Sequence, residues 1–189
     1  MIAIIIAWIT ISIVFLSSGN FIVFVYQKLF KRNENYGYTD TFLLGICFTL
    51  VLLSVTSFFL PSNQYILFFY LILCIIYWIY RKEHLYDIIS KSKKYIQTLS
   101  LSQKIAFAIS IVSIGAIVLW TSGAFDPAYY HYQAIRWNED YPIIPGLANL
   151  EDRFGFNSNY MLLSAPFTFR FIFGEAIYSL QSLLAVYIT

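Results

Sequence analysis

Residues 2–26 read IAIIIAWITISIVFLSSGNFIVFVY, and this stretch contains no charged side chain. A helix crosses the hydrocarbon core of a bilayer, about 30 Å thick, with roughly 20 mostly apolar residues. The stretch meets this length, although the polar group at residues 17–20 interrupts it. No basic region precedes it and no small-residue cleavage site follows it, so it differs from a secretory signal peptide. We therefore predict that residues 2–26 form a retained membrane span and that spans of this kind build the fold.

The overall composition is typical of a membrane protein. Of the 189 residues, 59% are hydrophobic and 12% are charged, and the mean hydropathy is +0.68. Soluble domains carry about 25% charged residues, and disordered chains are rich in charge and poor in apolar residues, so both classes are excluded. Cys47 and Cys74 lie inside apolar runs, which argues against a disulfide framework and a zinc site. The net charge of +2 gives no indication of a nucleic-acid partner.

Further apolar segments predict more spans. Three of them are apolar enough for one span each: residues 41–60, 65–80 and 105–123. A fifth apolar stretch, 160–189, is broken by Pro166, Arg170, Gly174 and Glu175. We expect it to form a short apolar helix and the start of a further, truncated span, so that the chain is the N-terminal part of a longer membrane protein. The predicted fold is an all-α polytopic transmembrane helical bundle, with four spans in residues 1–123 and a helical extracytoplasmic loop at 124–159.

The distribution of charge predicts the orientation of these spans. Lysine and arginine gather in the loops 27–40 and 81–104, whereas the loop 124–159 carries five acidic residues and two arginines. Basic residues are enriched in the cytoplasmic loops of membrane proteins. We therefore predict a multi-pass protein of the inner (cytoplasmic) membrane, with its N-terminus outside, both basic loops cytoplasmic and the acidic loop extracytoplasmic.

Within the second basic loop, residues 84–100 have the pattern of an amphipathic helix. Apolar side chains recur at helical spacing on one face: Leu85, Ile88, Ile89, Tyr95, Ile96 and Leu99. Lysines at 91, 93 and 94 flank the opposite face. A helix of this kind lies in the membrane interface, with its basic side toward anionic lipid headgroups. It is either a connector that rests on the membrane or an element that binds lipid or gates a substrate.

The loop 124–159 begins with FDPAYYHYQAIRW at residues 125–137. An aspartate followed by a proline favours a helix start, because Asp126 can cap the helix and Pro127 suits its first turn. We expect this helix to continue to about Glu139. Two interpretations concern structure alone: Asp126 only caps the helix, and the nearby tyrosines and tryptophan only form an aromatic belt at headgroup level.

The order of these residues resembles a motif of membrane enzymes. Residues 126–132 read Asp-Pro-x-Tyr-Tyr-His-Tyr, and Arg136 follows His131 by five positions. This pattern is similar to the first external loop of the GT-C superfamily of multi-spanning glycosyltransferases. Oligosaccharyltransferase catalytic subunits have a similar loop, which follows their first span rather than the fourth. The segments YPIIPGLANL at 141–150 and RFGFNS at 153–158 also resemble poorly characterised bacterial multi-spanning envelope proteins.

The resemblance implies an integral membrane glycosyltransferase. Such an enzyme would transfer a sugar from a polyprenyl-phosphate-linked donor at the extracytoplasmic face, for envelope polysaccharide or glycoconjugate synthesis. Asp126 would be the catalytic carboxylate, as a general base or as a metal ligand. Together with Glu151 and Asp152 it would hold a divalent cation, Mg²⁺ or Mn²⁺. The side chains expected to contact the donor phosphate or sugar are Tyr130, His131, Arg136, Arg153 and Arg170, since arginine binds phosphate through paired hydrogen bonds.

Arg170 lies in an apolar segment, where a charge is costly. Its partner is expected to be Glu175 or the donor phosphate; otherwise its side chain extends to the membrane surface. Glu139 and Asp140 are further candidates for a second carboxylate in the site.

Two other functions compete with the enzyme: a transporter or flippase for lipid-linked polysaccharide, and a non-catalytic membrane subunit. Transporters place ionisable residues or broken helices near the middle of the membrane. Here the acidic residues gather in the predicted external loop, and the first four predicted spans carry almost no charge, which favours chemistry at the membrane surface. The expected partners are membrane lipids and the polyprenyl-phosphate donor, and the fragment alone is expected to be inactive.

Overall fold

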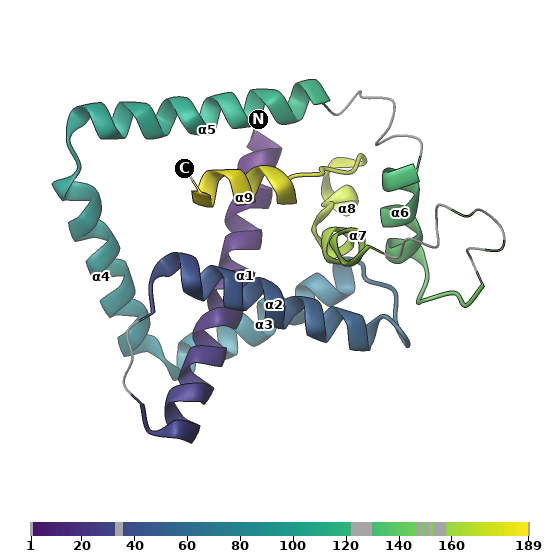
Figure 1. Ribbon diagram of the computed structural model, residues 1–189, viewed down its shortest axis with the longest axis horizontal. Coiled ribbons are helices and arrows are strands. Elements are labelled where there is room, and N and C mark those ends of the chain that lie inside the picture. The colour runs from purple at the N-terminus through teal and green to yellow at the C-terminus, as the bar shows by residue number, and fades with distance from the viewer. Residues whose placement is uncertain are drawn as a thin grey trace.

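The computed structural model describes residues 2–32, 36–121, 130–146, 149, 152 and 158–188. These residues form helices and no strand, so the predicted all-helical fold is confirmed for them. In chain order (Figure 1) the α-helices are α1 (Ile2–Phe30), α2 (Tyr38–Thr56), α3 (Gln64–Tyr80), α4 (Lys82–Thr98), α5 (Leu101–Thr121), α6 (Tyr132–Asp140), α7 (Asn159–Ser164), α8 (Arg170–Phe173) and α9 (Leu180–Ile188). A short 3₁₀ helix, η4 (Ala165–Phe167), follows α7 directly.

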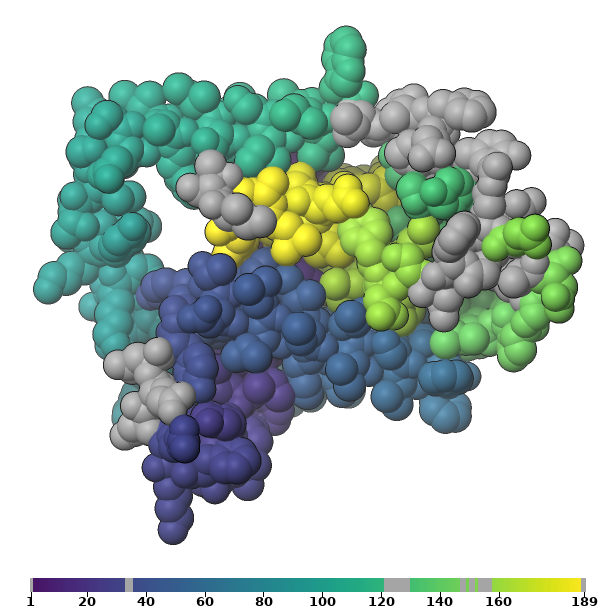
Figure 2. Space-filling model, viewed as in Figure 1, coloured from purple at the N-terminus to yellow at the C-terminus, as the bar shows by residue number. Residues whose placement is uncertain are grey.

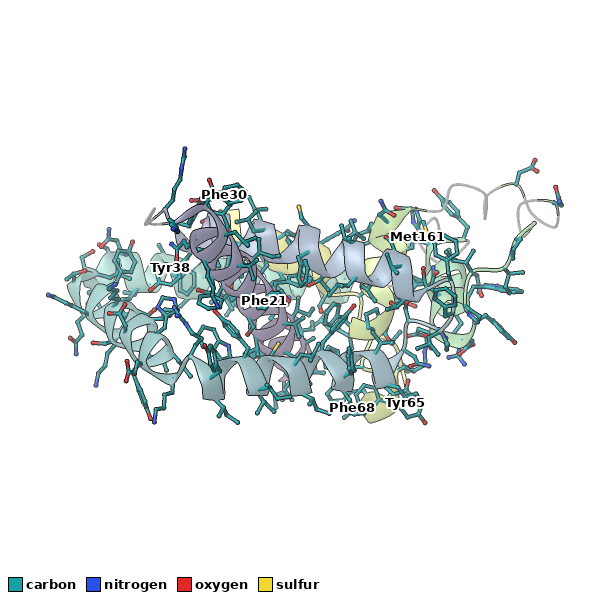
Figure 3. The ribbon with its side chains drawn as sticks, turned by 90° about the horizontal axis from the view of Figure 1, so that it is seen from below. Phe21, Phe30, Tyr38, Tyr65, Phe68 and Met161 are labelled. Atoms are coloured by element: carbon teal, nitrogen blue, oxygen red, sulfur yellow. The ribbon has the colours of Figure 1, made fainter. Side chains whose placement is uncertain are left out.

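Three helices are long and apolar enough to cross a membrane: α1, α2 and α5. α3 reaches a comparable length only together with α4, and the two are bent by 93°. Three of the four predicted spans are therefore complete helices, whereas α3, with 17 residues, is shorter than the roughly 20 that a straight span needs. The large side chains of Tyr65 and Phe68 on the outer side of α3 are exposed (Figure 3), which suits a surface in contact with lipid.

The polar group at residues 17–20 does not break α1 but forms its crossing with α2. A Cβ atom added at Gly19 would lie 1.8 Å from the carbonyl oxygen of Thr41. A Cβ atom added at Gly45 would lie 1.8 Å from the carbonyl oxygen of Phe15. Small residues permit this close approach between membrane helices, whose association depends on van der Waals packing. The sequence SSGN is therefore a packing site within a continuous helix.

The core joins the first three helices to the C-terminal segment. The buried ring of Phe15 meets the rings of Phe42 in α2 and Phe167 in η4 edge-to-face, with 5.5 Å between centroids in both pairs. Phe42 also stacks on Tyr187 of α9, with centroids 3.6 Å apart. Figure 2 shows the C-terminal segment, in yellow and yellow-green, against the blue helices of the N-terminal part. The described part of the stretch 160–189 thus belongs to the same core as α1, α2 and α3.

The break in the C-terminal stretch has a local cause. Phe169 has a φ of 52° and Gly174 a φ of 76°, and this left-handed conformation interrupts a helix. Phe169 is 3% exposed, so burial of its ring offsets the strain of a non-glycine residue in that conformation. The backbone N–H of Ile177 then donates to the carbonyl of Thr168 at 2.8 Å. The expected short apolar helix corresponds to α7 and η4, and α9 lies where the further span was expected to start.

In Figure 1, α4 lies along the left edge of the molecule and α5 along the top. α4, which the structure describes throughout, has no buried residue. Its exposed apolar side chains include Tyr86, Ile89, Tyr95 and Ile96. α5 packs against α9 and is otherwise largely exposed. A helix is therefore present where the sequence predicts an amphipathic one at 84–100, and its position in the membrane interface stays a prediction.

Candidate functional site

The predicted site residues fall into two groups. Asp126, Glu151 and Arg153 lie outside the described residues, and so does the expected helix start at Asp126. The described group consists of Tyr130, His131, Arg136, Asp152 and Arg170. α6, which follows the expected helix start in the sequence, ends at Asp140, one residue beyond the predicted end.

Glu139 of α6 is buried, with only 7% of its surface exposed, and it lies in a polar cluster that joins α6 to α8. The hydroxyl of Thr168 donates to Oε1 of Glu139, and Nε of Arg170 donates to Oε2 at 3.1 Å. Both carboxylate oxygens are therefore paired, which offsets the cost of burying a charge. We call the residues Glu139, Thr168, Arg170 and Tyr178 the Glu139 cluster.

Tyr178 completes the cluster beside Arg170. Burial raises the pKa of the Tyr178 phenol, and the opposing effect of the Arg170 charge and hydrogen bond is smaller. The Tyr178 ring stacks on Tyr132 of α6, with centroids 3.9 Å apart and 4° between the ring planes. Burial also raises the pKa of Tyr132. Both phenols are therefore protonated at neutral pH and stand as neutral groups beside the ion pair.

Arg170 is positioned by the cluster but not enclosed by it. Its side chain is 30% exposed, against 8% for the side chain of Glu139. The Nε atom is bound to Glu139, and a guanidinium carries four further N–H donors. A guanidinium held in this way is suited to an oxyanion such as phosphate. Of the expected partners, Glu175 occupies an exposed position, and the structure pairs Arg170 with Glu139 instead.

Arg136 of α6 is exposed, and His131, the residue before α6, is half-buried. Arg136 Nε donates to Asp140, one turn later, in an ion pair whose side chains are 45% and 40% exposed. The hydrogen bond to Asp140 raises the pKa of the Arg136 guanidinium. An exposed pair of this type contributes only about 0.3–0.5 kcal/mol, so it constrains Arg136 little. The ring of His131 contacts that of Tyr130, with centroids 4.1 Å apart.

Backbone hydrogen bonds hold the α6 region against the turn between α2 and α3. The N–H of Ser62 donates to the carbonyl of Asn138 at 2.7 Å, and the N–H of Ile143 donates to the carbonyl of Ser57 at 2.8 Å. Ser57 and Ser62 are both buried. The structure therefore brings α6, with Arg136, and the pair of Glu139 and Arg170 together at this end of α2 and α3.

The predicted metal site involves residues of both groups. Among the described residues, no group of three or more His, Cys, Asp or Glu side chains is placed to bind one ion. Asp152 is described and exposed, whereas its expected partners Asp126 and Glu151 lie outside the described residues. A set of three carboxylates suits Mg²⁺ or Mn²⁺, which prefer oxygen ligands, and the site stays a prediction.

The sequence indicated Glu139 only as a candidate second carboxylate, and it did not single out Thr168 or Tyr178. One feature of the sequence indicates that Glu139 is buried. Glu139 follows the apolar Ile135 by four positions, so both residues lie on one helical face, and Ile135 is 1% exposed. No local pattern connects Glu139 with Thr168, which is 29 positions away, because only the folded chain brings them together.

Comparison with known proteins places the chain in a family. The search of curated proteins and the search of solved structures found no match. A family model described as Domain of unknown function (DUF8201) matches residues 1–189. The chain therefore belongs to the DUF8201 family.

Proposed function

We propose that the protein is an integral membrane glycosyltransferase, which transfers a sugar from a polyprenyl-phosphate-linked donor at the extracytoplasmic face for envelope polysaccharide or glycoconjugate synthesis. The observation that carries this proposal is the Glu139 cluster, in which a buried carboxylate orients the partly exposed Arg170 beside α6. A fixed guanidinium is a suitable contact for phosphate. α6 also carries Arg136, and the sequence that leads into α6 contains Asp126.

In the proposed reaction, a hydroxyl of the acceptor attacks the anomeric carbon of the donor sugar. The carboxylate of Asp126 accepts the hydroxyl proton as a general base. A new C–O bond forms at the anomeric carbon while the bond from that carbon to the phosphate oxygen breaks, and the polyprenyl phosphate leaves with the bonding electron pair. Arg170 and Arg136 offset the negative charge on the phosphate.

The remaining predicted residues have supporting roles in this proposal. Tyr130, His131 and Arg153 contact the donor sugar or phosphate. The carboxylates of Asp126, Glu151 and Asp152 would hold a divalent cation, and the bound cation would supply further positive charge toward the phosphate.

Contacts between loops support a site on one face of the membrane. The turn between the second and third predicted spans lies outside if the spans alternate, and it meets the predicted external loop, since the N–H of Ser62 donates to the carbonyl of Asn138 in α6. The two segments predicted to be cytoplasmic also meet, because the hydroxyl of Tyr38 lies 3.0 Å from Oγ of Ser92. Each contact joins segments that the predicted alternation of spans assigns to the same side of the membrane.

The proposal is tested by Asp126→Asn in the full-length protein, expressed as the sole copy in its host. Asparagine caps a helix about as well as aspartate, so folding and membrane level should be retained. Incorporation of labelled sugar into the envelope polymer should be abolished, because the base is lost. Glu83→Gln is the matched control, since it removes an exposed carboxylate of α4 outside the site. Normal incorporation by Asp126→Asn at a normal protein level would show that Asp126 is only a helix cap and that the proposed site is wrong.

A further inference from the structure

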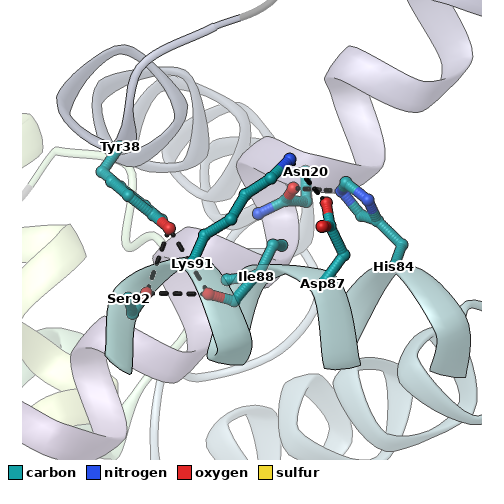
Figure 4. Close-up of polar contacts among 7 residues, drawn as sticks. All are labelled: Asn20, Tyr38, His84, Asp87, Ile88, Lys91 and Ser92. Atoms are coloured by element: carbon teal, nitrogen blue, oxygen red, sulfur yellow. Dashed lines mark hydrogen bonds and ion pairs between the residues drawn. The ribbon is translucent and has the colours of Figure 1, made fainter. Parts of the chain in front are cut away.

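A pocket of about 280 Å³ lies at the ends of α2 and α3 that are remote from the Glu139 cluster. It is open on one side and bounded by the C-terminal half of α1, the first turn of α2, and the bend between α3 and α4. Polar side chains line it from all three sides, among them Asn20, Tyr38, Arg81, His84, Asp87 and Lys91. Figure 4 shows how most of these side chains converge.

Arg81 supplies a cation at the bend itself. Its Cζ atom lies 4.5 Å from the centroid of the Phe24 ring, a cation–π contact that holds the guanidinium in place. Its Nε atom is buried, and no described residue accepts a hydrogen bond from this atom. A buried donor without an acceptor is unfavourable. The guanidinium of Arg81 therefore has an unused capacity to bind the oxygen of a ligand.

The lining of the pocket has an excess of positive charge. Asp87 contributes a carboxylate, but Lys91 neutralises it at 2.7 Å, which leaves the charge of Arg81 in excess among the described lining residues. Burial lowers the pKa of His84, and the charge of Arg81 lowers it further, with Lys91 acting in the same direction and Asp87 against it. The neutral His84 ring lies 3.3 Å from Oδ1 of Asn20. An anion would be favoured in this environment.

The surroundings of the pocket favour a lipid as the source of that anion. One wall is α4, whose exposed side chains include both large apolar residues and the lysines at 93 and 94. Helices of this kind lie at the level of the lipid headgroups, where basic side chains attract anionic lipids. Sites for small molecules have volumes of about 300–1,000 Å³, so a pocket of about 280 Å³, just below this range, suits a headgroup whose acyl chains remain in the bilayer.

We propose that this pocket binds the phosphate of an anionic lipid headgroup, with Arg81 and Lys91 as charged contacts and Tyr38 as a neutral one. The hydroxyl of Tyr38 also lies 3.0 Å from Oγ of Ser92, so the bound headgroup lies where the start of α2 is tied to α4. This site is separate from the Glu139 cluster, and lipid binding there does not depend on the proposed transferase activity.

The test measures binding of short-chain phosphatidylglycerol to the purified chain in a neutral detergent, with short-chain phosphatidylcholine and inorganic phosphate as comparison ligands. The wild type should bind phosphatidylglycerol at least about tenfold more tightly than either comparison ligand. Arg81→Gln should weaken this binding by about tenfold or more, since it removes charge-assisted hydrogen bonds to the phosphate. Lys91→Gln should weaken it to a smaller extent.

Two further variants make the test independent of folding defects. Asp87→Asn removes the carboxylate that competes with the ligand for Lys91, so it should strengthen binding of phosphatidylglycerol, and misfolding does not produce such a gain. Lys104→Gln removes an equal charge from α5, outside the pocket, and should leave binding unchanged. Equal losses in Lys91→Gln and Lys104→Gln, or no gain in Asp87→Asn, would overturn the site. Inorganic phosphate that binds as tightly as phosphatidylglycerol in an Arg81-dependent manner would overturn the lipid as its ligand.

Discussion

Replacing Glu139 by glutamine removes one charge from the Glu139 cluster with almost no change in side-chain size. The amide oxygen of glutamine can accept a hydrogen bond from Thr168 or from Arg170, but it carries no negative charge. Arg170 would then keep its positive charge next to a side-chain position that is 8% exposed. We therefore expect Glu139→Gln to lower the stability of the folded protein by leaving Arg170 without a counter-charge.

The solvent exposure of Glu139 and Arg170 determines how much stability the Glu139→Gln protein loses. Removing one partner of a fully buried ion pair costs about 3–5 kcal/mol, whereas an exposed pair contributes about 0–1 kcal/mol. Because Arg170 is 30% exposed, solvent screens part of its charge, and we expect a loss of about 1–3 kcal/mol. The double variant Glu139→Gln/Arg170→Met should recover most of this loss, because no unpaired charge remains.

The assay is the free energy of unfolding from denaturant titration of the purified protein in detergent, compared among the single and double variants. Asp140→Asn is the control: it breaks the exposed pair with Arg136 and should cost less than about 1 kcal/mol. A Glu139→Gln protein as stable as Asp140→Asn would refute the reasoning. A double variant that is less stable than Glu139→Gln would refute it as well, since the two charges would then not depend on each other.

Three other predictions concern packing, pH and orientation. Gly45→Ala places a Cβ atom 1.8 Å from the carbonyl of Phe15, so the unfolding free energy should fall by about 1–3 kcal/mol, and unchanged stability would contradict the helix crossing. Burial lowers the pKa of His84 below its usual value of 6.5, so the unfolded chain binds this proton at higher pH than the folded one. Stability should therefore be highest above about pH 6.5 and fall as the pH drops through that value, and a thermal-unfolding series should show a smaller fall for His84→Gln. In a variant without native cysteines, a cysteine at Asn149 should react with an impermeant thiol reagent in intact cells, whereas one at Lys94 should not; the reverse labelling would contradict the orientation.

Hydropathy was sufficient to predict most of the helices. A helix that spans a bilayer needs a long apolar segment, and few segments that do not span a membrane are both long and apolar. It did not predict how those helices pack. The group at residues 17–20 has the appearance of an interruption in the sequence, yet it is the point of contact with Gly45, which belongs to another helix. The sequence predicted a break in the stretch 160–189 but not the left-handed conformation of Phe169, because the positive φ of this non-glycine residue is stabilised by burial of its ring in a core that forms only in the folded chain.

The candidate site shows the same limit. The sequence singled out Arg170 as a charge in an apolar segment, because the residue type alone makes this position costly. It did not identify the partner of Arg170, because Glu139 lies 31 positions earlier in the chain, whereas helical spacing indicates only nearby acidic residues such as Glu175. Thr168 was overlooked for a related reason: a threonine in an apolar run has no distinctive pattern until its hydroxyl is placed beside a carboxylate.

Arg170 is the described residue on which the proposed donor site depends most. The decisive measurement is the affinity of the full-length protein for a short-chain polyprenyl phosphate, compared between the wild type and Arg170→Lys. Lysine keeps the charge that pairs with Glu139, so the unfolding free energy should change little, but it loses the paired hydrogen bonds that a guanidinium makes to phosphate. We expect the affinity of Arg170→Lys to be lower by about tenfold or more. Equal affinities in two equally stable proteins would contradict a donor phosphate at Arg170.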